Sequence, residues 1–153
     1  PGIGGIEAIR RIILFDGNAK ILVFSMHEEL VFVEQALQAG AHGYMTKSSN
    51  PQLLSKAIKQ IYNGKKYIDD ELQKRMLYKK STEDDPQLSD LSTREFQIFC
   101  LLAEGLTTAE ISKQLSISYK TAANYGTQIK NKLNVTTVAD IARIAIRHNI
   151  IEA

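Results

Sequence analysis

Residues 107–121, TTAEISKQLSISYKT, decide the fold of the C-terminal half of the chain. Thr107 and Glu110 have the spacing of a capping box, in which a hydroxyl and an acid three residues later satisfy free amides at a helix start. This first helix ends at a tight connection, residues 116–117, and Ser118 is placed to cap a second, longer helix. A short helix joined to a longer one by a tight turn is the helix-turn-helix arrangement.

Further helix signals flank this motif on both sides. Ser92 and Glu95 form another capping-box pair, and Gly105 is expected to end the helix that starts there. A last helix is expected to start near Thr137, so the region contains four helices and no strand pattern. The residues expected to meet in their common core are Phe96, Phe99, Cys100, Leu102, Ala103, Ile111, Leu115, Ala122, Tyr125, Ile129, Leu133, Ile141, Ala142 and Ala145.

Charge patterning in this region favours a nucleic-acid partner. The net charge of the whole chain is only +2, so such a partner requires basic residues to be gathered in one place. Residues 111–139 contain four lysines and no Asp or Glu, so a phosphate backbone would meet little repulsion there. Amides on the outer face of the long helix suit adenine edges, and lysines suit phosphates. The residues expected to bind DNA are Thr107, Thr108, Ser118, Lys120, Thr121, Ala123, Asn124, Thr127, Gln128, Lys130, Asn131 and Lys132.

Pattern alone leaves an ordinary small helical bundle equally compatible with these features, because a few lysines on four helices are commonplace. The three histidines, His27, His42 and His148, do not have metal-ligand spacing. No nucleophile, base and orienting group are suggested, so we expect a protein that is not an enzyme, with no catalytic and no metal-binding residues.

The N-terminal half alternates helix and strand signals. Apolar runs at 21–24 and 43–46 are typical of short strands buried in a parallel sheet. Helix patterns occupy 6–13, 28–39 and 51–62. This order predicts a doubly wound, flavodoxin-like α/β unit whose opening strands are missing from the sequence.

Domain boundaries follow from these patterns and from a polar, proline-containing stretch at 81–86, which is typical of a linker. We place the partial α/β unit at residues 1–64, the linker at 65–90 and the all-α four-helix unit at 91–153. The single cysteine, Cys100, excludes an intrachain disulfide and is expected to be buried. Without a secretory signal or membrane-spanning run, the sequence indicates a cytoplasmic protein.

Four segments of the helical unit resemble a known signature in order and spacing. These segments are LSTRE at 91–95, EGLTTAEI at 104–111, LSISYKT at 115–121 and KLNV at 132–135. They resemble the LuxR-type domain of NarL/FixJ response regulators, and AIRH at 145–148 is similar to the GacA/UvrY-like branch. The resemblance implies that the helix from Ser118 enters the major groove of double-stranded DNA and that the helix from Thr137 supplies a homodimer contact. Two residues depart from the pattern: Ala122 replaces the usual Val, and Gly126 stands where the related branch tends to have Arg.

Residues 1–64 resemble the C-terminal half of a receiver domain, the phosphorylatable module of two-component systems. The run QAGAHGYMTK at 38–47 carries much of this similarity. The resemblance implies three switch residues: Ser25 as the hydroxyl that bonds a phosphoryl oxygen, Tyr44 as the mobile aromatic, and Lys47 as the cation that pairs with the phosphoryl group.

The acids that bind Mg²⁺ and accept the phosphoryl group in this family belong to strands that would precede Pro1. We therefore expect no cofactor in this chain, and Asp16 is no substitute because it lies in a loop. A sensor histidine kinase is the expected partner if the receiver is complete in the native protein.

A half receiver is expected to leave an apolar face and an unpaired strand edge in water. Either a second copy of the chain, as in a domain swap, or residues before Pro1 are expected to cover them. Gel filtration combined with intact mass tests this expectation, because a monodisperse monomer with a cooperative melt would contradict it.

The sequence thus predicts a DNA-binding transcriptional response regulator of a bacterial two-component system. A first alternative is a dimerising decoy module without productive DNA binding, favoured by Gly126 and the partial receiver. A second is a sigma-factor-like helix-turn-helix protein, against which the receiver-like half argues.

Overall fold

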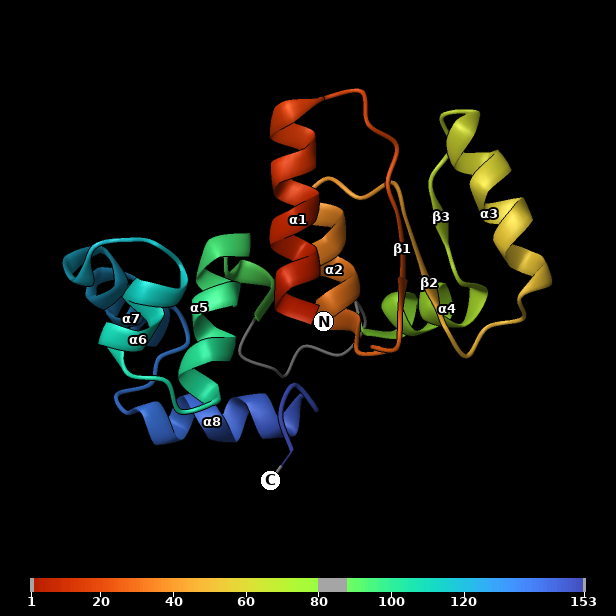
Figure 1. Cartoon of the computed structure of the whole chain (residues 1–153). Coiled ribbons are helices and arrows are strands. Elements are labelled where there is room, and N and C mark those ends of the chain that lie inside the picture. Colours follow the sequence, from red (N-terminus) through yellow and green to blue (C-terminus); the bar gives the residue numbers. More distant parts are fainter. Residues whose placement is uncertain (1, 80–87, 153) are drawn as a thin grey trace. The chain divides into compact units, whose positions relative to one another are not determined.

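The chain divides into two compact units, residues 1–85 and 86–153. The computed structural model describes residues 2–79 and 88–152, so the linker signal at 81–86 lies outside the described residues. The elements of the first unit are α1 (Gly2–Phe15), β1 (Leu22–Ser25), α2 (Leu30–Gln38), β2 (Gly43–Thr46), α3 (Gln52–Tyr62), β3 (Tyr67–Ile68) and α4 (Asp70–Lys79) (Figure 1).

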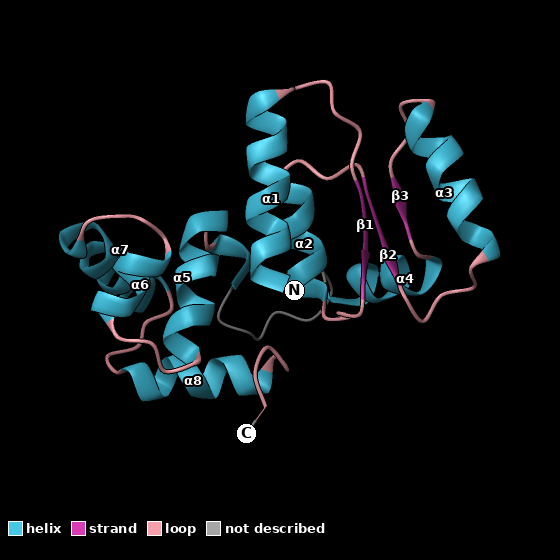
Figure 2. Cartoon of the chain, in the orientation of Figure 1, coloured by secondary structure: helices cyan, strands magenta, loops and turns pink. Residues whose placement is uncertain are grey.

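The strands of the first unit form a parallel sheet in the order β1-β2-β3. β1 pairs with β2 along its whole length, whereas β3 pairs only with the first half of β2, through Gly43 and Tyr44. Figure 2 shows α1 and α2 on one side of these strands and α3 on the other. This layered arrangement confirms the α/β class and the alternating element order expected from the sequence.

Residues 67–79 correct one expectation, because they form β3 and α4 instead of linker. Tyr67 and Leu72 are buried in the first unit and anchor the two elements. A two-residue strand is too short to show a period, and the charged residues around Leu72 hide its apolar anchor. The first unit therefore extends well beyond residue 64.

One edge of the sheet is open. Among the described residues β1 pairs only with β2, and its other edge faces a groove of about 470 Å³ lined by Ile6, Ile9 and other apolar side chains. Phe24 is 43% exposed and Met26 is 73% exposed at this edge. The apolar face expected from the sequence is therefore present, and what covers it stays a prediction.

The second unit is helical and consists of a short 3-10 helix (Leu88–Asp90), α5 (Thr93–Ala103), α6 (Thr108–Gln114), α7 (Tyr119–Lys132) and α8 (Val138–Arg147). Both capping boxes expected from the sequence are present, at Ser92 and Thr107, and Thr137 forms a third with Asp140. The turn between α6 and α7 contains Ser116 at φ 52°, a left-handed conformation that allows the sharp change of direction.

The core of the second unit is built around α5, which contacts α6, α7 and α8. Phe96 and Phe99 are fully buried and stack with 6.1 Å between ring centroids. Cys100 is also buried, as expected, and this burial raises the pKa of its thiol far above the ordinary value. None of the helices within the described ranges is both long and apolar enough to cross a bilayer.

Candidate nucleic-acid interface and switch cluster

α7 has two faces of opposite character. Ala122 and Ile129 are buried against the rest of the helical unit. Lys120, Asn124 and Thr127, which the sequence placed on the opposite face, are all exposed. Because 3.6 residues make one turn, these exposed positions fall on one stripe of the helix. The stripe is therefore free to meet an external partner.

Several residues expected to bind DNA also shape the two helices of the motif. Ser118 caps α7, since its hydroxyl accepts a hydrogen bond from Thr121 N at 3.0 Å. Thr107 accepts from Glu110 N at 3.3 Å in the same way at the start of α6, and Thr127 Oγ1 donates to the backbone oxygen of Ala123 at 3.2 Å. These hydroxyls retain exposed positions, so capping and binding are compatible.

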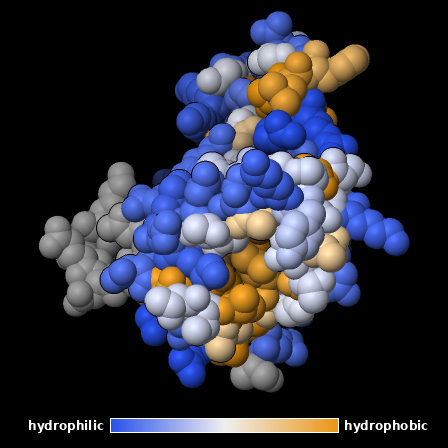
Figure 3. Space-filling view, turned by 90° about the vertical axis from the view of Figure 1, so that its left-hand side faces the viewer, coloured by the Kyte–Doolittle hydropathy of each residue, from blue (hydrophilic) through white to orange (hydrophobic). Residues whose placement is uncertain are grey.

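Other residues of the predicted set hold no side-chain hydrogen bond or ion pair within the described ranges: Lys120, Asn124, Gln128, Lys130 and Asn131. Figure 3 views the side of the molecule where α6 and α7 lie, and it shows a band of hydrophilic residues with a hydrophobic patch below it. Thr108 and Ala123 are half-buried beside them. We call the exposed side chains of residues 118–131 the α7 surface.

Lys132 differs from the other lysines of the predicted set. Its Nζ lies 2.7 Å from Glu95 Oε2 and donates to the backbone oxygen of Asp90 at 3.2 Å. The Glu95 side chain is 6% exposed, whereas the Lys132 side chain is 43% exposed. Burial alone raises the pKa of Glu95, but hydrogen bonds from Lys132 and Ser92 outweigh it, so the pKa lies below its ordinary value. Lys132 therefore ties the end of α7 to the start of α5.

The sequence did not reveal two further residues of this region. Arg94 Nη2 donates to the backbone oxygen of Leu115 at 3.3 Å, which joins α5 to the end of α6. Tyr119 is 62% exposed in the first turn of α7, next to Lys120. The one sequence signal that could have singled out Tyr119 is an aromatic residue beside a helix cap. No local signal could have found the Arg94 contact, because it joins residues 21 positions apart.

Gly126 lies in the middle of α7 where a side chain would fit. A Cβ atom added there would meet nothing closer than Leu102 Cδ1, at 3.9 Å, which is ordinary van der Waals contact. Gly126 is also in normal helical conformation, since its φ is not positive. Packing therefore does not require glycine at this position.

We expect Gly126→Ala to raise the free energy of unfolding of the second unit by about 1 kcal/mol. Alanine loses less backbone entropy on helix formation, and no clash opposes that gain. Urea unfolding followed by circular dichroism measures the change. Gly105→Ala is the matched control and should destabilise, because Gly105 has φ +88°. A loss of stability in Gly126→Ala would contradict the space seen around this residue.

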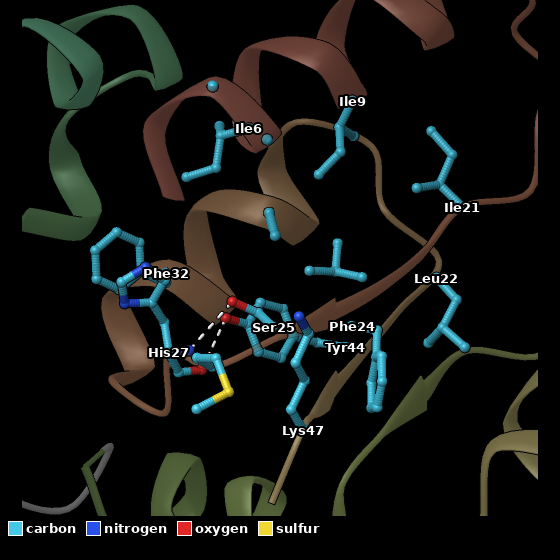
Figure 4. A pocket seen from close by; sticks show the side chains of 15 residues that line it. Ile6, Ile9, Ile21, Leu22, Phe24, Ser25, His27, Phe32, Tyr44 and Lys47 are labelled. Atoms are coloured by element: carbon cyan, nitrogen blue, oxygen red, sulfur yellow. Dashed lines mark hydrogen bonds between the residues drawn. The ribbon is translucent and has the colours of Figure 1, made fainter. Parts of the chain in front are cut away.

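In the first unit, the three expected switch residues lie close together: Ser25 ends β1, Lys47 follows β2, and Tyr44 in the first half of β2 reaches the residues after β1 with its hydroxyl. Ser25 Oγ accepts a hydrogen bond from His27 N at 3.1 Å, and the Tyr44 hydroxyl donates to the backbone oxygen of His27 at 2.9 Å. Lys47 N donates to the backbone oxygen of Ser25 at 2.7 Å. Figure 4 shows the side chains of Ser25, Tyr44 and Lys47 converging at one end of the groove beside β1.

Tyr44 points inward in this structure and is 2% exposed. Burial is the main cause that raises the pKa of its hydroxyl, and the nearby Glu29 adds to it. Lys47 is exposed and its ammonium group has no hydrogen-bond or ion-pair partner within the described ranges. The cluster thus presents one free cation beside the hydroxyl of Ser25.

The described residues do not fit the Mg²⁺ site that a receiver domain implies. No group of three His, Cys, Asp or Glu side chains within residues 2–79 and 88–152 could hold a metal ion. The cluster can therefore offer hydrogen bonds and charge to an anion, and we derive no step through a metal.

Comparisons with known protein families match both units. The luxR family of bacterial regulatory proteins matches residues 89–145, and the response regulator receiver domain matches residues 1–59. The response regulator UvrY of Escherichia coli (strain K12) is 34% identical over 155 residues, which cover 100% of this chain and 71% of UvrY. The response regulator GacA of Pseudomonas aeruginosa is 34% identical over 155 residues, covering 100% of this chain and 72% of GacA.

Solved structures agree with these similarities. A LuxR-family two-component response regulator from Aurantimonas sp. SI85-9A1 is 41% identical over 54% of this chain and 59% of its own, with a TM-score of 0.51. RcsB of Salmonella enterica serovar Typhimurium, solved bound to a promoter, covers 92% of this chain with a TM-score of 0.66. The match spans 66% of RcsB, and its 22% identity shows the fold alone. The chain therefore belongs to the response regulators that join a receiver domain to a luxR-type domain.

Proposed function

We propose that this chain binds double-stranded DNA through the α7 surface and acts as a transcriptional regulator of a bacterial two-component system. The observation that carries the proposal is that α7 exposes Lys120, Asn124 and Gln128 on a surface whose sequence, residues 111–139, holds no acid. Amide side chains can bond base edges in the major groove, and lysines neutralise phosphates. Both relatives named above are response regulators, which supports the same conclusion.

The first unit is proposed to act as the input half of the regulator. Ser25, Tyr44 and Lys47 line one end of the groove, which suits a phosphoryl oxygen approached by a hydroxyl and a cation. The proposed activity is binding and switching rather than catalysis, and we propose the cytoplasm as its location. A sensor histidine kinase is the proposed partner where the phosphoacceptor is supplied. No contact within the described residues favours the decoy alternative, and the receiver match opposes a sigma factor.

Homodimer formation is proposed to use α8. Val138 and Ile146 are large apolar residues exposed on this helix, and Ala142 lies between them at helical spacing. A two-fold pair of such helices would place two copies of α7 on successive half-sites of DNA.

DNA binding can be tested by fluorescence anisotropy with a fluorescein-labelled duplex of random sequence over a series of salt concentrations. Neutralised phosphates release counterions, so we expect affinity to fall steeply with salt, with a slope of about −0.9 per phosphate contact. Affinity that does not depend on salt would contradict the proposal.

Within that assay, Lys120→Ala should weaken binding to all sequences and reduce the salt slope by about 1. Lys120 is exposed and unpaired among the described residues, so its removal leaves folding intact. Lys74→Ala in α4 is the control, because it removes the same charge from the first unit. Equal slopes for the two variants would show that Lys120 does not contact phosphate.

A further inference from the structure

Asp69 is a buried acid that the proposed function does not use. It is the first residue after β3 and is 7% exposed. Its Oδ2 atom accepts a hydrogen bond from Thr46 N at 3.1 Å and lies 3.4 Å from Thr46 Oγ1. The hydroxyl of Ser49 also donates to Oδ2. One carboxylate oxygen thus accepts from two donors of the segment that contains Lys47, Thr46 N and the Ser49 hydroxyl, and lies near the Thr46 hydroxyl as well.

The carboxylate replaces a missing part of the sheet. In β2, amides and carbonyls of alternate residues face β3, and Asp69 N donates to the Tyr44 oxygen at 3.2 Å as the last rung of that ladder. Thr46 N points the same way, but β3 has already ended at Ile68. Without Asp69 this buried amide would lack a partner, which proteins rarely tolerate.

An aspartate directly before a helix would ordinarily cap that helix with its own carboxylate. Here Oδ2 reaches instead across to Thr46 and Ser49. The backbone of Asp69 still takes part in α4, since its carbonyl accepts from Gln73 N at 2.8 Å. Asp69 alone therefore connects the end of β2, through its side chain, to the start of α4, through its backbone.

Lys47 lies in the sequence between Thr46 and Ser49, the two residues that bond to the Asp69 carboxylate. Its backbone amide is fixed to β1 by the bond to Ser25, and Ser48 Oγ donates to Glu28 Oε1 at 2.6 Å. The side chains of Thr46 and Ser49 are bonded to each other as well, at 2.7 Å. The segment 46–49 is thus held on both sides, while the ammonium group of Lys47 stays exposed.

We propose that Asp69 is a positioning residue that couples the Lys47 segment to α4. An anion drawn to Lys47 moves residues 46–49, and the shared carboxylate transmits that movement to the first turn of α4. The coupling role rests on the proposed function of Lys47 as the cation that senses a phosphoryl group. The anchoring of residues 46–49 by the Asp69 carboxylate does not depend on that function and rests only on the contacts described above.

Amide hydrogen exchange of the full chain, followed by NMR, tests the anchoring. Asp69→Asn should speed exchange of the Thr46 amide roughly tenfold or more, because a neutral amide oxygen is a weaker acceptor than a carboxylate. The Lys47 amide resonance should shift in the same variant. Asp70→Asn is the matched control, since it removes an exposed acid one residue later and should leave Thr46 unchanged. Equal Thr46 exchange in the two variants would overturn the proposal.

Ser49→Ala tests the coupling with a milder change, which remains informative even if Asp69→Asn unfolds the first unit. It removes one donor from the loop and changes no residue of α4, so faster exchange at the Gln73 amide would show transmission through Asp69. The two substitutions should also be non-additive at Gln73, because they break the same contact. Unchanged exchange at Gln73 in Ser49→Ala would overturn the coupling. DNA affinity of the same samples reports separately on the proposed function.

Discussion

Replacing Ile129 with alanine is expected to lower the free energy of unfolding of the second unit by about 2–5 kcal/mol. Ile129 is fully buried on the inner side of α7, and α7 contacts both α5 and α6. Removing its side chain leaves a cavity in a small core that cannot collapse fully around it. Because small domains are only marginally stable, this loss removes a large share of the total free energy of unfolding. Urea unfolding followed by circular dichroism measures it.

Substitution of the neighbouring residue, Gln128, is expected to have the opposite effects: little change in stability and weaker DNA binding. Gln128 is exposed on the α7 surface, so Gln128→Ala should change stability by less than about 0.5 kcal/mol. It should nevertheless weaken DNA binding, since its amide is free to bond a base edge. If Gln128→Ala unfolded the unit while Ile129→Ala did not, the orientation of α7 described here would be wrong.

Local chemistry explains why much of the second unit was predictable. Capping requires a hydroxyl and an acid three residues apart, and Thr107 with Glu110 satisfies this at the predicted position. The cap at Ser118 then fixed where α7 begins, and a period of 3.6 residues fixed which of its side chains face outward. The exposure of Lys120 and Asn124 followed from that period alone.

Contacts between distant residues were not predictable in the same way. Glu95 and Lys132 lie 37 positions apart, and no local pattern links an acid in one helix to a lysine two helices later. The sequence therefore grouped Lys132 with the lysines of the DNA face, although its ammonium group is bonded to a buried acid. Asp69 and Thr46, 23 positions apart, meet for the same kind of reason, because a two-residue strand between them leaves no periodic signal.

Glu95→Gln is expected to lower the free energy of unfolding of the second unit by about 2 kcal/mol near neutral pH. Glutamine keeps the size of the side chain but leaves Lys132 without a negative partner. The folded state lowers the pKa of Glu95 from its ordinary value of 4.5, so the ionised form contributes stability above that pH. The contribution is lost as pH falls through the lower pKa of the folded state. The difference between the two proteins should therefore shrink on acidification below about pH 4.5, whereas Glu104→Gln at an exposed position should show little difference at any pH.

Lys132→Met separates a structural role of this lysine from a DNA contact. Solvent reaches the partly exposed ammonium group, so the ion pair contributes less than a fully buried one would. Removing Lys132 still leaves the carboxylate of Glu95 buried without its cation, and the variant should be destabilised about as much as Glu95→Gln. Combining the two substitutions should cost less than their sum, because each breaks the same contact. If Lys132 acts mainly through Glu95, the salt slope of DNA binding should stay unchanged in Lys132→Met, in contrast to Lys120→Ala. A slope reduced by about 1 in both variants would instead assign Lys132 to the phosphate contacts.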